Sequence, residues 1–247
     1  ITPPEWVGLK NYLRVFTNPE LLNALFNTVL WVLGTLLLPV GLALFLAKLI
    51  TQSGTKGVFK AFFFLPATFS PTIAGIIWRR VLTSQQGAIM SIVNAAGGTA
   101  TPILTNGDIN TYIMIGVWTW QFLGLNLILF LVGFETLPRE PLESARIDGA
   151  TERQIFFHVE VPLLWPILML VVANAIINSA RMFDIPWVMV QGGPGRVSET
   201  LAVSLYRESF LLFKMGLGSA IGVVISLLTL LLAFRFLSSF QGKTGVR

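Results

Sequence analysis

Long apolar stretches without a single charged residue dominate the pattern of this chain. Five of them are apolar throughout: residues 21–47, 61–78, 109–134, 161–180 and 215–234. Each reaches the roughly 18 to 20 residues that a helix needs to cross a bilayer. The pattern therefore predicts an all-α integral membrane protein with one membrane domain over residues 1–247. The five predicted spanning helices lie at 22–47, 61–78, 110–134, 161–180 and 215–236.

A sixth charge-free stretch, residues 81–107, differs because turn-favouring residues interrupt it repeatedly. Gln85-Gln86-Gly87, Gly97-Gly98-Thr99 and Pro102 break any long helix there. We expect a loop outside the bilayer, with one short surface helix near residues 88–95.

The composition supports a membrane protein and excludes other classes. Hydrophobic residues make up 54% of the 247 residues and charged residues only 12%, whereas about 25% is usual in soluble domains. So few charges cannot cover a globular surface, but a bilayer requires none along its apolar band. The chain has no cysteine and one histidine, His158, so we predict no metal site. We assign the net charge of +5 to lipid headgroups, because no basic cluster interleaved with aromatic residues indicates nucleic acid.

Residues 135–160 form a charged island between the third and fourth predicted spans. They include six acidic residues, Glu135, Glu140, Glu143, Asp148, Glu152 and Glu160, against three arginines, Arg139, Arg146 and Arg153. The island is either a helix pair that rests on lipid or a docking element for another protein. An acidic element suits an anionic leaflet poorly, which favours the protein partner.

Local signals predict two short helices in this island. Pro138 and Pro141 interrupt the helix that arrives from the third span, since neither can donate a backbone hydrogen bond. A helix over residues 143–147 is expected to follow, with Glu143 and Arg146 paired on its surface.

A turn and a second capped helix complete the island. Gly149 permits a sharp turn, and Thr151 with Gln154 three residues later has the spacing of a capping box. One face of the second helix is apolar, with Ile155, Phe156 and Val159. Pro162 is expected to mark its end, where the chain re-enters the membrane.

These residues resemble the "EAA" loop of permease subunits in binding-protein-dependent ABC importers. The pattern is matched at Glu143, Ala145, Asp148, Gly149, Ala150, Phe156 and Pro162, with Ser144 where the family usually has alanine. Two further stretches, residues 6–12 and 183–195 with Glu199-Thr200-Leu201, resemble the carbohydrate-uptake branch that includes maltose- and glycerol-phosphate-type permeases. Together the similarity covers nearly the whole chain.

The resemblance implies a set of partners. It implies a second, similar permease, two ATPase subunits and an extracellular or periplasmic solute-binding protein, with ATP and Mg²⁺ bound by the ATPases. This chain would then bind no cofactor and contribute no catalytic residue. The coupling to the ATPases would fall to Glu143, Ser144, Ala145, Asp148, Gly149, Ala150, Phe156 and Pro162. The resemblance also implies an earlier spanning helix, and a chain that starts at Ile1 without methionine agrees with missing upstream residues.

Five polar residues inside the predicted spans are candidates for the substrate pathway: Asn174, Asn178 and Ser179 in the fourth span, and Gln121 and Asn126 in the third. Polar groups at that depth are costly unless they face protein or a wet cavity. They either hydrogen-bond between helices or line a route where they contact sugar hydroxyls. Just beyond the fourth span, Arg181 and Asp184 are expected to pair with each other.

The segment Gly192-Gly193-Pro194-Gly195 is glycine-rich but is not a phosphate loop. It lacks the following Lys-Ser/Thr, so we expect a tight external turn. The external segments 1–20, 81–108 and 182–213 are long for simple connectors. We expect them to receive the binding protein, with Trp187, Gly192, Gly193 and Pro194 in contact with it.

Orientation depends mainly on the resemblance, which places the charged island and the C-terminus in the cytoplasm of a prokaryotic cell. With that orientation the cytoplasmic side carries nine of the 17 Lys and Arg residues. The loop at residues 48–60 gives local support, because it has three lysines and no acid.

Two other functional classes and two substrate classes stay open. A secondary transporter would need ionisable residues inside the spans to carry coupling ions, and an intramembrane enzyme would need a catalytic constellation there; the sequence shows neither. A mono- or oligosaccharide is the expected substrate, and glycerol phosphate is the alternative. The lack of Lys or Arg within a span favours a neutral sugar.

Overall fold

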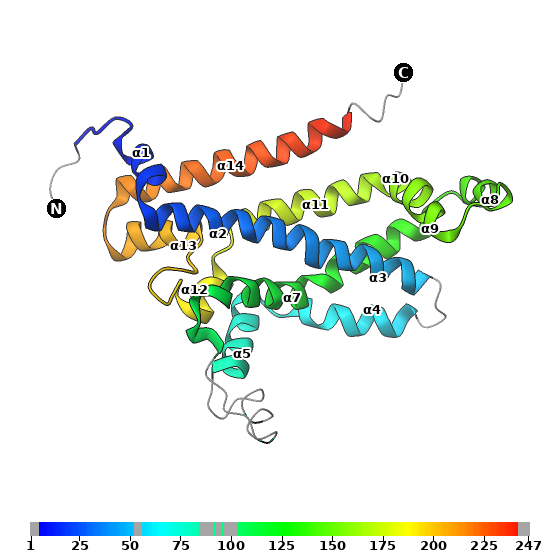
Figure 1. Cartoon of the computed structure of the whole chain (residues 1–247), viewed down its shortest axis with the longest axis horizontal. Helices are drawn as coiled ribbons and strands as arrows, with labels where there is room; N and C mark the ends of the chain where they lie inside the picture. The colour runs from blue at the N-terminus through cyan, green and yellow to red at the C-terminus, as the bar shows by residue number, and fades with distance from the viewer. Residues whose placement is uncertain (1–4, 52–55, 84–90, 92–94, 96–102, 242–247) are drawn as a thin grey trace.

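The computed structural model describes residues 5–51, 56–83, 91, 95 and 103–241, and it is helical, with no strand in this part of the chain. Its helices run side by side in a bundle (Figure 1). In chain order they are α1 (Lys10–Thr17), α2 (Pro19–Thr35), η1 (Leu36–Val40), α3 (Gly41–Thr51), α4 (Lys56–Phe64), η2 (Leu65–Thr68), α5 (Pro71–Thr83), η3 (Ile103–Thr105), α7 (Gly107–Glu135), α8 (Arg139–Ile147), α9 (Glu152–Ile155), η4 (Phe156–Glu160), α10 (Val161–Leu163), α11 (Trp165–Ala180), α12 (Asp184–Val190), α13 (Leu201–Tyr206), η5 (Arg207–Leu211) and α14 (Met215–Gln241). The expected surface helix near 88–95 lies outside the described residues, apart from two isolated positions.

The first span is one long helix that includes α2, η1 and α3. Asn18 caps it, because its side-chain oxygen accepts a hydrogen bond from the backbone N–H of Glu20 at 2.8 Å. Pro19 occupies the first position, where its missing N–H costs nothing. A π-helical turn accommodates Pro39 in the middle. The helix extends over Pro19–Thr51, 33 residues, and is therefore longer than the predicted span at 22–47.

The second predicted span, residues 61–78, is not one helix. α4 with η2 and then α5 meet at an angle of 93°, with Phe69 extended between them. Pro71 explains the break, because it has no N–H and disfavours helical backbone at the residue before it. The side-chain amide of Gln121 on α7 donates to the Phe69 carbonyl oxygen at 2.7 Å, which satisfies one backbone group at the break. A Cβ at Gly124 would overlap the carbonyl of Phe63, so only glycine lets α7 approach the end of α4 this closely.

The fourth predicted span also begins later than expected. α9, η4 and α10 run into α11 with a 73° bend, and Leu164 stands at the turn between them. Pro162 lies inside α10 and does not end the preceding helix, which corrects that prediction. The bend instead precedes Pro166, which cannot donate to the carbonyl four residues earlier. α11 therefore starts at Trp165, four residues after the predicted start.

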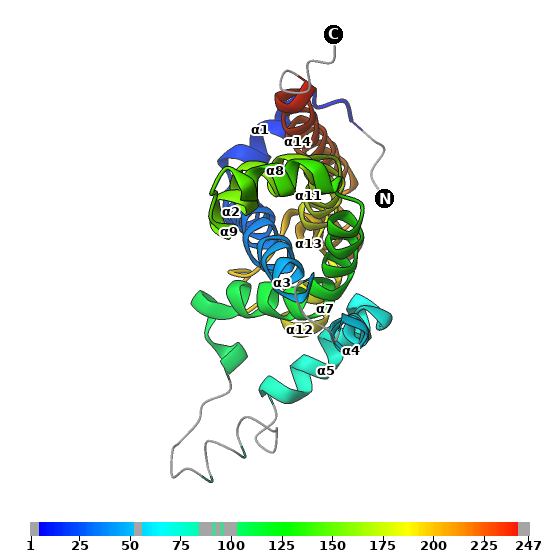
Figure 2. The same cartoon turned by 90° about the vertical axis from the view of Figure 1, so that its right-hand side faces the viewer.

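In the described residues, three helices are long and apolar enough to cross a membrane: Pro19–Thr51, Gly107–Glu135 and Met215–Phe236. Up to five crossings result if each of the two bent pairs is one span. α8 and α9 lie at one end of the bundle, near the ends of α3 and α7, and α1, α12 and α13 lie at the other (Figures 1 and 2). We call these the loop end and the opposite end.

α7 is the central helix of the bundle. Its side chains Leu127, Phe130 and Leu131 are fully buried against α3 and α11 in one apolar cluster. Towards the opposite end, Met114 packs with Trp31 in a second cluster. Because lipid tails are as apolar as leucine, such contacts hold a membrane bundle together by close packing and not by expulsion of water.

Candidate functional site

The predicted coupling loop is an ordered helix pair at the loop end of the bundle. α8 begins at Arg139 and not at Glu143 as expected, because Pro138 precedes the helix and Pro141 falls in its first turn, where proline is tolerated. Gly149 has φ +79°, and the N–H of Ala150 donates to the carbonyl of Ala145 at 3.0 Å. This pattern closes the C-terminus of α8 and produces the predicted sharp turn.

The predicted capping box is present at the start of α9. The backbone N–H of Thr151 donates to the Gln154 side chain at 2.8 Å, and the N–H of Gln154 donates back to the Thr151 hydroxyl at 3.4 Å. Ile155, the last residue of α9, is fully buried. Phe156 stacks on Phe134 at the end of α7, with ring centroids 6.4 Å apart. The apolar face therefore fastens the loop to the bundle.

Ion pairs extend from the loop to the first span. Arg146 pairs with Glu152 at 3.1 Å and not with Glu143, which corrects the predicted pair. This hydrogen bond from Arg146 lowers the pKa of Glu152 below its ordinary value. Lys48, at the end of α3, pairs with Glu160 at 2.7 Å and lies 3.6 Å from Glu152. Local sequence patterns do not predict this contact, because 112 residues separate Lys48 from Glu160.

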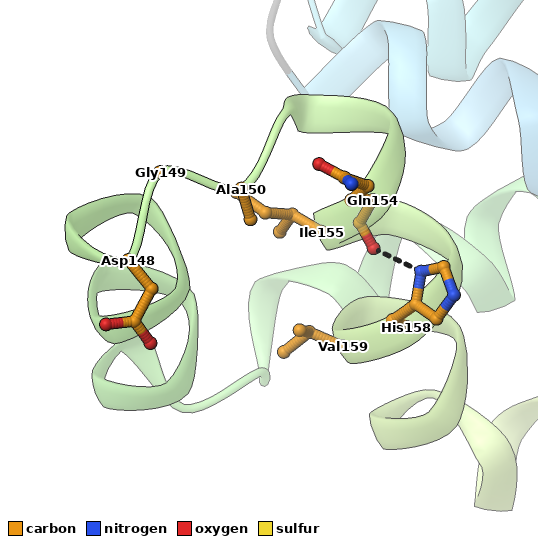
Figure 3. Close-up of a pocket in the computed structure, with 7 residues that line it drawn as sticks. All are labelled: Asp148, Gly149, Ala150, Gln154, Ile155, His158 and Val159. Carbon is orange, nitrogen blue, oxygen red and sulfur yellow. Dashed lines mark hydrogen bonds between the residues drawn. The ribbon is translucent and has the colours of Figure 1, made fainter.

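A shallow hollow opens between the two helices of the loop (Figure 3). It is lined by Asp148, Gly149, Ala150, Gln154, Ile155, His158 and Val159, and it measures about 390 Å³. The Nδ1 of His158 lies 3.0 Å from the Gln154 carbonyl oxygen and is directed at it. Three of the predicted coupling residues thus line one open concave surface.

The other predicted coupling residues are not among those that line this hollow. On α8, Glu143 and Ser144 are exposed and Ala145 is half-buried. Phe156 is half-buried in η4, and Pro162 is exposed in α10. Ile147, which the sequence analysis did not single out, is 85% exposed beside them. An exposed apolar side chain among acidic ones is typical of a surface that binds protein. In the sequence, the sign of its exposure is its position between two charged residues, Arg146 and Asp148.

The candidate pathway residues do not form one surface. Asn174 is exposed and Asn178 half-buried on the outer side of α11, where the Asn178 amide donates to the Asn174 side chain at 2.8 Å. Ser179 is buried, and its hydroxyl donates to the Ala175 carbonyl of its own helix. Gln121 and Asn126 are buried in α7. Of the five, Asn174 and Asn178 face away from the core of this chain.

One of these asparagines lines a polar hollow at the end of α11. The hollow measures about 310 Å³ and is lined by Pro71, Trp118, Phe122, Asn178, Arg181, Met182, Phe183 and Asp184. The rings of Trp118 and Phe122 stack with centroids 3.7 Å apart. Arg181 donates to the Ile177 carbonyl and Asp184 accepts from Thr72, so the predicted pairing of Arg181 with Asp184 is wrong. An amide, a guanidinium, a carboxylate and aromatic rings therefore face one space.

At the opposite end, the predicted external turn is tightly built. Gln191, Gly192, Gly195 and Arg196 all have positive φ. A Cβ at Gly192 would overlap the Glu199 side chain, so glycine is required there. Pro194 and Gly195 are exposed at the tip, whereas Gly192 is buried and Gly193 half-buried.

Trp187 belongs to an aromatic group beside this turn. Its ring stacks on Phe183 at 5.8 Å and meets Tyr206 edge-on at 4.9 Å. The Arg207 guanidinium lies 6.0 Å from the centre of the Trp187 ring. The ring is half-buried, so it both packs and presents an edge to the surface.

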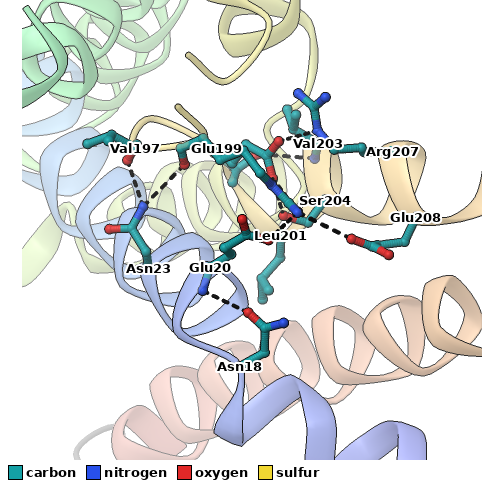
Figure 4. A network of polar contacts seen from close by, with 12 residues as sticks. Asn18, Glu20, Asn23, Val197, Glu199, Leu201, Val203, Ser204, Arg207 and Glu208 are labelled. Carbon is teal, nitrogen blue, oxygen red and sulfur yellow. Dashed lines mark hydrogen bonds and ion pairs between the residues drawn. The ribbon is translucent and has the colours of Figure 1, made fainter. Parts of the chain in front are cut away.

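An ion cluster that the sequence analysis missed holds this end together (Figure 4). Glu199 is fully buried and accepts from Arg196, Arg207 and the Ser204 hydroxyl. Arg196 also contacts Glu20 on α2 and Glu208 on η5. Burial opposes the charge of Arg196, but hydrogen bonding and attraction from Glu199 outweigh it and raise the Arg196 pKa. In the sequence, the only sign of this ion cluster is that two acidic residues and two arginines occur within residues 196–208.

α2 holds the same segment through neutral side chains. Asn27 donates to the carbonyls of Val197 at 2.6 Å and Glu199 at 2.9 Å. Asn23 donates to the carbonyl of Val197 at 2.7 Å (Figure 4). The Thr28 hydroxyl accepts from the N–H of Leu201 at 2.9 Å. The segment after the turn is thus fixed to the start of the first span.

An apolar helical bundle with several helices long enough to cross a bilayer is the architecture of a multi-pass membrane protein. Residues 29–243 match the family described as "Binding-protein-dependent transport system inner membrane component", and this chain belongs to that family. The predicted resemblance and the all-α membrane fold are confirmed.

Known relatives agree with this assignment. The arabinooligosaccharides transport system permease protein AraP of Bacillus subtilis is 32% identical over 245 residues, which cover 96% of this chain and 78% of that protein. The sn-glycerol-3-phosphate transport system permease protein UgpA of Agrobacterium fabrum is 29% identical over 234 residues, covering 94% of this chain and 80% of that protein. A chain in the crystal structure of a bacterial alginate ABC transporter, in complex with its alginate pentasaccharide-bound periplasmic protein, has the same fold. It matches 93% of this chain and 81% of its own length with a TM-score of 0.83 and 19% identity.

Proposed function

We propose that this chain is the translocation subunit of an ATP-driven importer that takes up a mono- or oligosaccharide delivered by an external solute-binding protein. A second permease completes the pathway, and two ATPase subunits bind ATP and Mg²⁺ and drive it. This chain binds no cofactor and performs no catalysis. The loop end and the C-terminus face the cytoplasm.

The observation that carries the proposal is the ordered loop at residues 135–160. Its two helices are closed by a capping box and by the turn at Gly149, and aromatic stacking fastens it to α7. Its outer surface is acidic, with two exposed large apolar side chains, Ile147 and Phe157, and a shallow hollow. A rigid element of this kind binds a protein and passes on a rigid-body movement, whereas a loop that rests on lipid needs an apolar face turned outward.

The polar hollow at the end of α11 supports a sugar as substrate. Sugars are recognised by hydrogen bonds to hydroxyls and by contact of their apolar faces with aromatic rings. Asn178 and Asp184 can form hydrogen bonds with sugar hydroxyls, and the stacked rings of Trp118 and Phe122 can contact an apolar sugar face. The AraP relative, whose name assigns it arabinooligosaccharides, agrees with this class.

Glycerol phosphate is the second candidate, and one residue favours it. Arg181 lies one residue beyond α11 and lines the same hollow. A guanidinium binds phosphate well, so the hollow offers a phosphate a cation although the predicted spans 161–180 and 110–134 contain no Lys or Arg. The UgpA relative carries a glycerol-phosphate name.

Purification and transport distinguish these functions from a secondary transporter. Tagged chain extracted from its own membranes should retain an ATPase, and vesicles should take up substrate only with ATP and a loaded binding protein. Thermal-shift screening of the cognate binding protein against a panel of sugars and glycerol phosphate identifies the substrate. Uptake driven by an ion gradient without any ATPase would refute the proposal.

A further inference from the structure

The helix Pro19–Thr51 is long enough to connect the loop end of the protein with the opposite end. At a rise of 1.5 Å per residue, its 33 residues span about 50 Å, against about 30 Å for the hydrocarbon core of a bilayer. Both of its ends therefore extend beyond the apolar band. At each end, polar side chains hold the helix to another segment of this chain. Under the proposed function, each of these segments contacts a partner protein.

At the loop end, the contact is the ion pair of Lys48 with Glu160. The side chains of Lys48 and Glu160 are only 14% and 7% exposed, and their charged atoms lie 2.7 Å apart. Glu152 and Arg146 extend the contact from Lys48 to α8 at 3.6 and 3.1 Å. The second oxygen of Glu160 is buried with no other hydrogen-bond partner in the described structure, so Lys48 alone neutralises this carboxylate.

At the opposite end, the contacts are those of Asn23, Asn27 and Thr28 with the backbone of residues 197–201. Asn27 is 5% exposed and Thr28 is 1% exposed. This backbone follows directly on the turn that we expect to meet the binding protein. A movement of the turn therefore cannot leave the start of α2 in place without breaking these hydrogen bonds, two of which are buried.

We propose that the helix Pro19–Thr51 is the element that couples the binding-protein face to the ATPase face, with Asn27 and Lys48 as the positioning residues at its two ends. The inference rests on the proposed function and goes beyond it, because the family role of the loop does not say which helix carries the signal. Coupling between two sites is a single free energy that belongs to both sites. Weakening the attachment at either end of the helix therefore lowers the same coupling free energy.

The competing carrier is α7. It runs directly into the loop, and near its other end Asn110 donates to the carbonyl of Gly193 at 3.2 Å. α11 is a poorer candidate, since a 73° bend separates it from the loop. The test therefore needs variants on both helices.

The experiment measures ATPase turnover of the complete complex in lipid nanodiscs, with and without sugar-loaded binding protein. The readout is the stimulation factor, the ratio of the two rates. Lys48→Met and Asn27→Leu should each lower it about tenfold, within the range usual for coupling between sites. Turnover without binding protein should stay within about twofold of wild type. The double variant should fall little further than the single ones, because both changes interrupt one connection.

Three controls sharpen the result. The exchange of charges in Lys48→Glu with Glu160→Lys should restore most of the stimulation. Lys60→Met removes a more exposed ion pair at the same end, to Glu135 at 3.3 Å, and should change nothing. Asn110→Leu tests α7. If Lys48→Met prevents assembly, Lys48→Gln with Glu160→Gln removes the ion pair without leaving an unpaired buried charge, and the same loss of stimulation is then expected.

Two outcomes are distinct. A wild-type complex that holds no ATPase contradicts the proposed function itself. A stimulated wild type with undiminished stimulation in Lys48→Met and Asn27→Leu overturns only this inference. Loss of stimulation in Asn110→Leu alone would overturn it as well and assign the coupling to α7.

Discussion

Replacing Glu199 with glutamine should destabilise the opposite end of the bundle far more than the same change at Glu20. Both carboxylates contact Arg196, which makes the two substitutions a matched pair. They differ in surroundings, because the Glu199 side chain is fully buried whereas that of Glu20 is 52% exposed.

The magnitude follows from this difference. Removing one partner of a buried ion pair costs about 3–5 kcal/mol. The side chains of Arg196 and Arg207 keep 18% and 24% exposure, so water compensates them in part, and glutamine retains one acceptor oxygen. We therefore expect a loss of about 2–3 kcal/mol for Glu199→Gln. For Glu20→Gln the loss should stay below about 1 kcal/mol, as usual for exposed pairs.

Thermal unfolding of the purified chain in detergent, followed by tryptophan fluorescence, measures this. A domain of this size loses about 2–4 °C in midpoint per kcal/mol, so Glu199→Gln should unfold about 4–12 °C below wild type. Glu20→Gln should remain within a few degrees of wild type. Equal shifts in the two variants, or none in Glu199→Gln, would refute the conclusion that burial makes the Glu199 cluster the main polar support of this end.

Three further variants, one of them a double substitution, test the loop, the helix packing and the pathway. Gly149→Val places a β-branched residue at φ +79°, a strain of about 1–3 kcal/mol, and should lower ATPase co-purification and sugar uptake while the chain remains inserted; unchanged values would contradict a role in coupling. Gly124→Ala should destabilise the chain in detergent by about 1–3 kcal/mol, whereas Gly116→Ala on the same helix, with open space around it, should not. Asn174→Leu with Asn178→Leu should reduce uptake or alter substrate preference in an assembled complex; intact kinetics would assign both residues to helix packing.

Local signals in the sequence predicted much of the fold. The capping box of Thr151 and Gln154 and the turn at Gly149 depend on residues within a few positions of one another, and both are present. The apolar stretches likewise predicted the first, third and fifth spanning helices, with ends that differ by a few residues. Such features need no knowledge of the rest of the chain.

Contacts between distant segments could not be predicted in the same way. Nothing near Lys48 indicates that Glu160 will neutralise it, and nothing near Glu199 indicates two arginines and a serine around its carboxylate. The polarity of Gln121 inside a span predicts a pathway residue, yet its side-chain amide donates to the Phe69 carbonyl oxygen. The hydrophobic pattern and the composition indicate that a polar group is buried. Only the folded bundle shows which group forms a hydrogen bond with it.

The break between α4 and α5 has a consequence for how the chain is made. An open backbone carbonyl in hydrocarbon costs several kcal/mol, and the group that satisfies Phe69 arrives 52 residues later, on α7. Gly124, whose lack of a side chain admits the end of α4, arrives on the same helix. During synthesis the second apolar segment therefore cannot adopt its bent form in lipid until the third has entered the membrane. It must wait beside the insertion machinery or insert straight and bend afterwards, so the order of synthesis determines the order in which this part of the bundle folds.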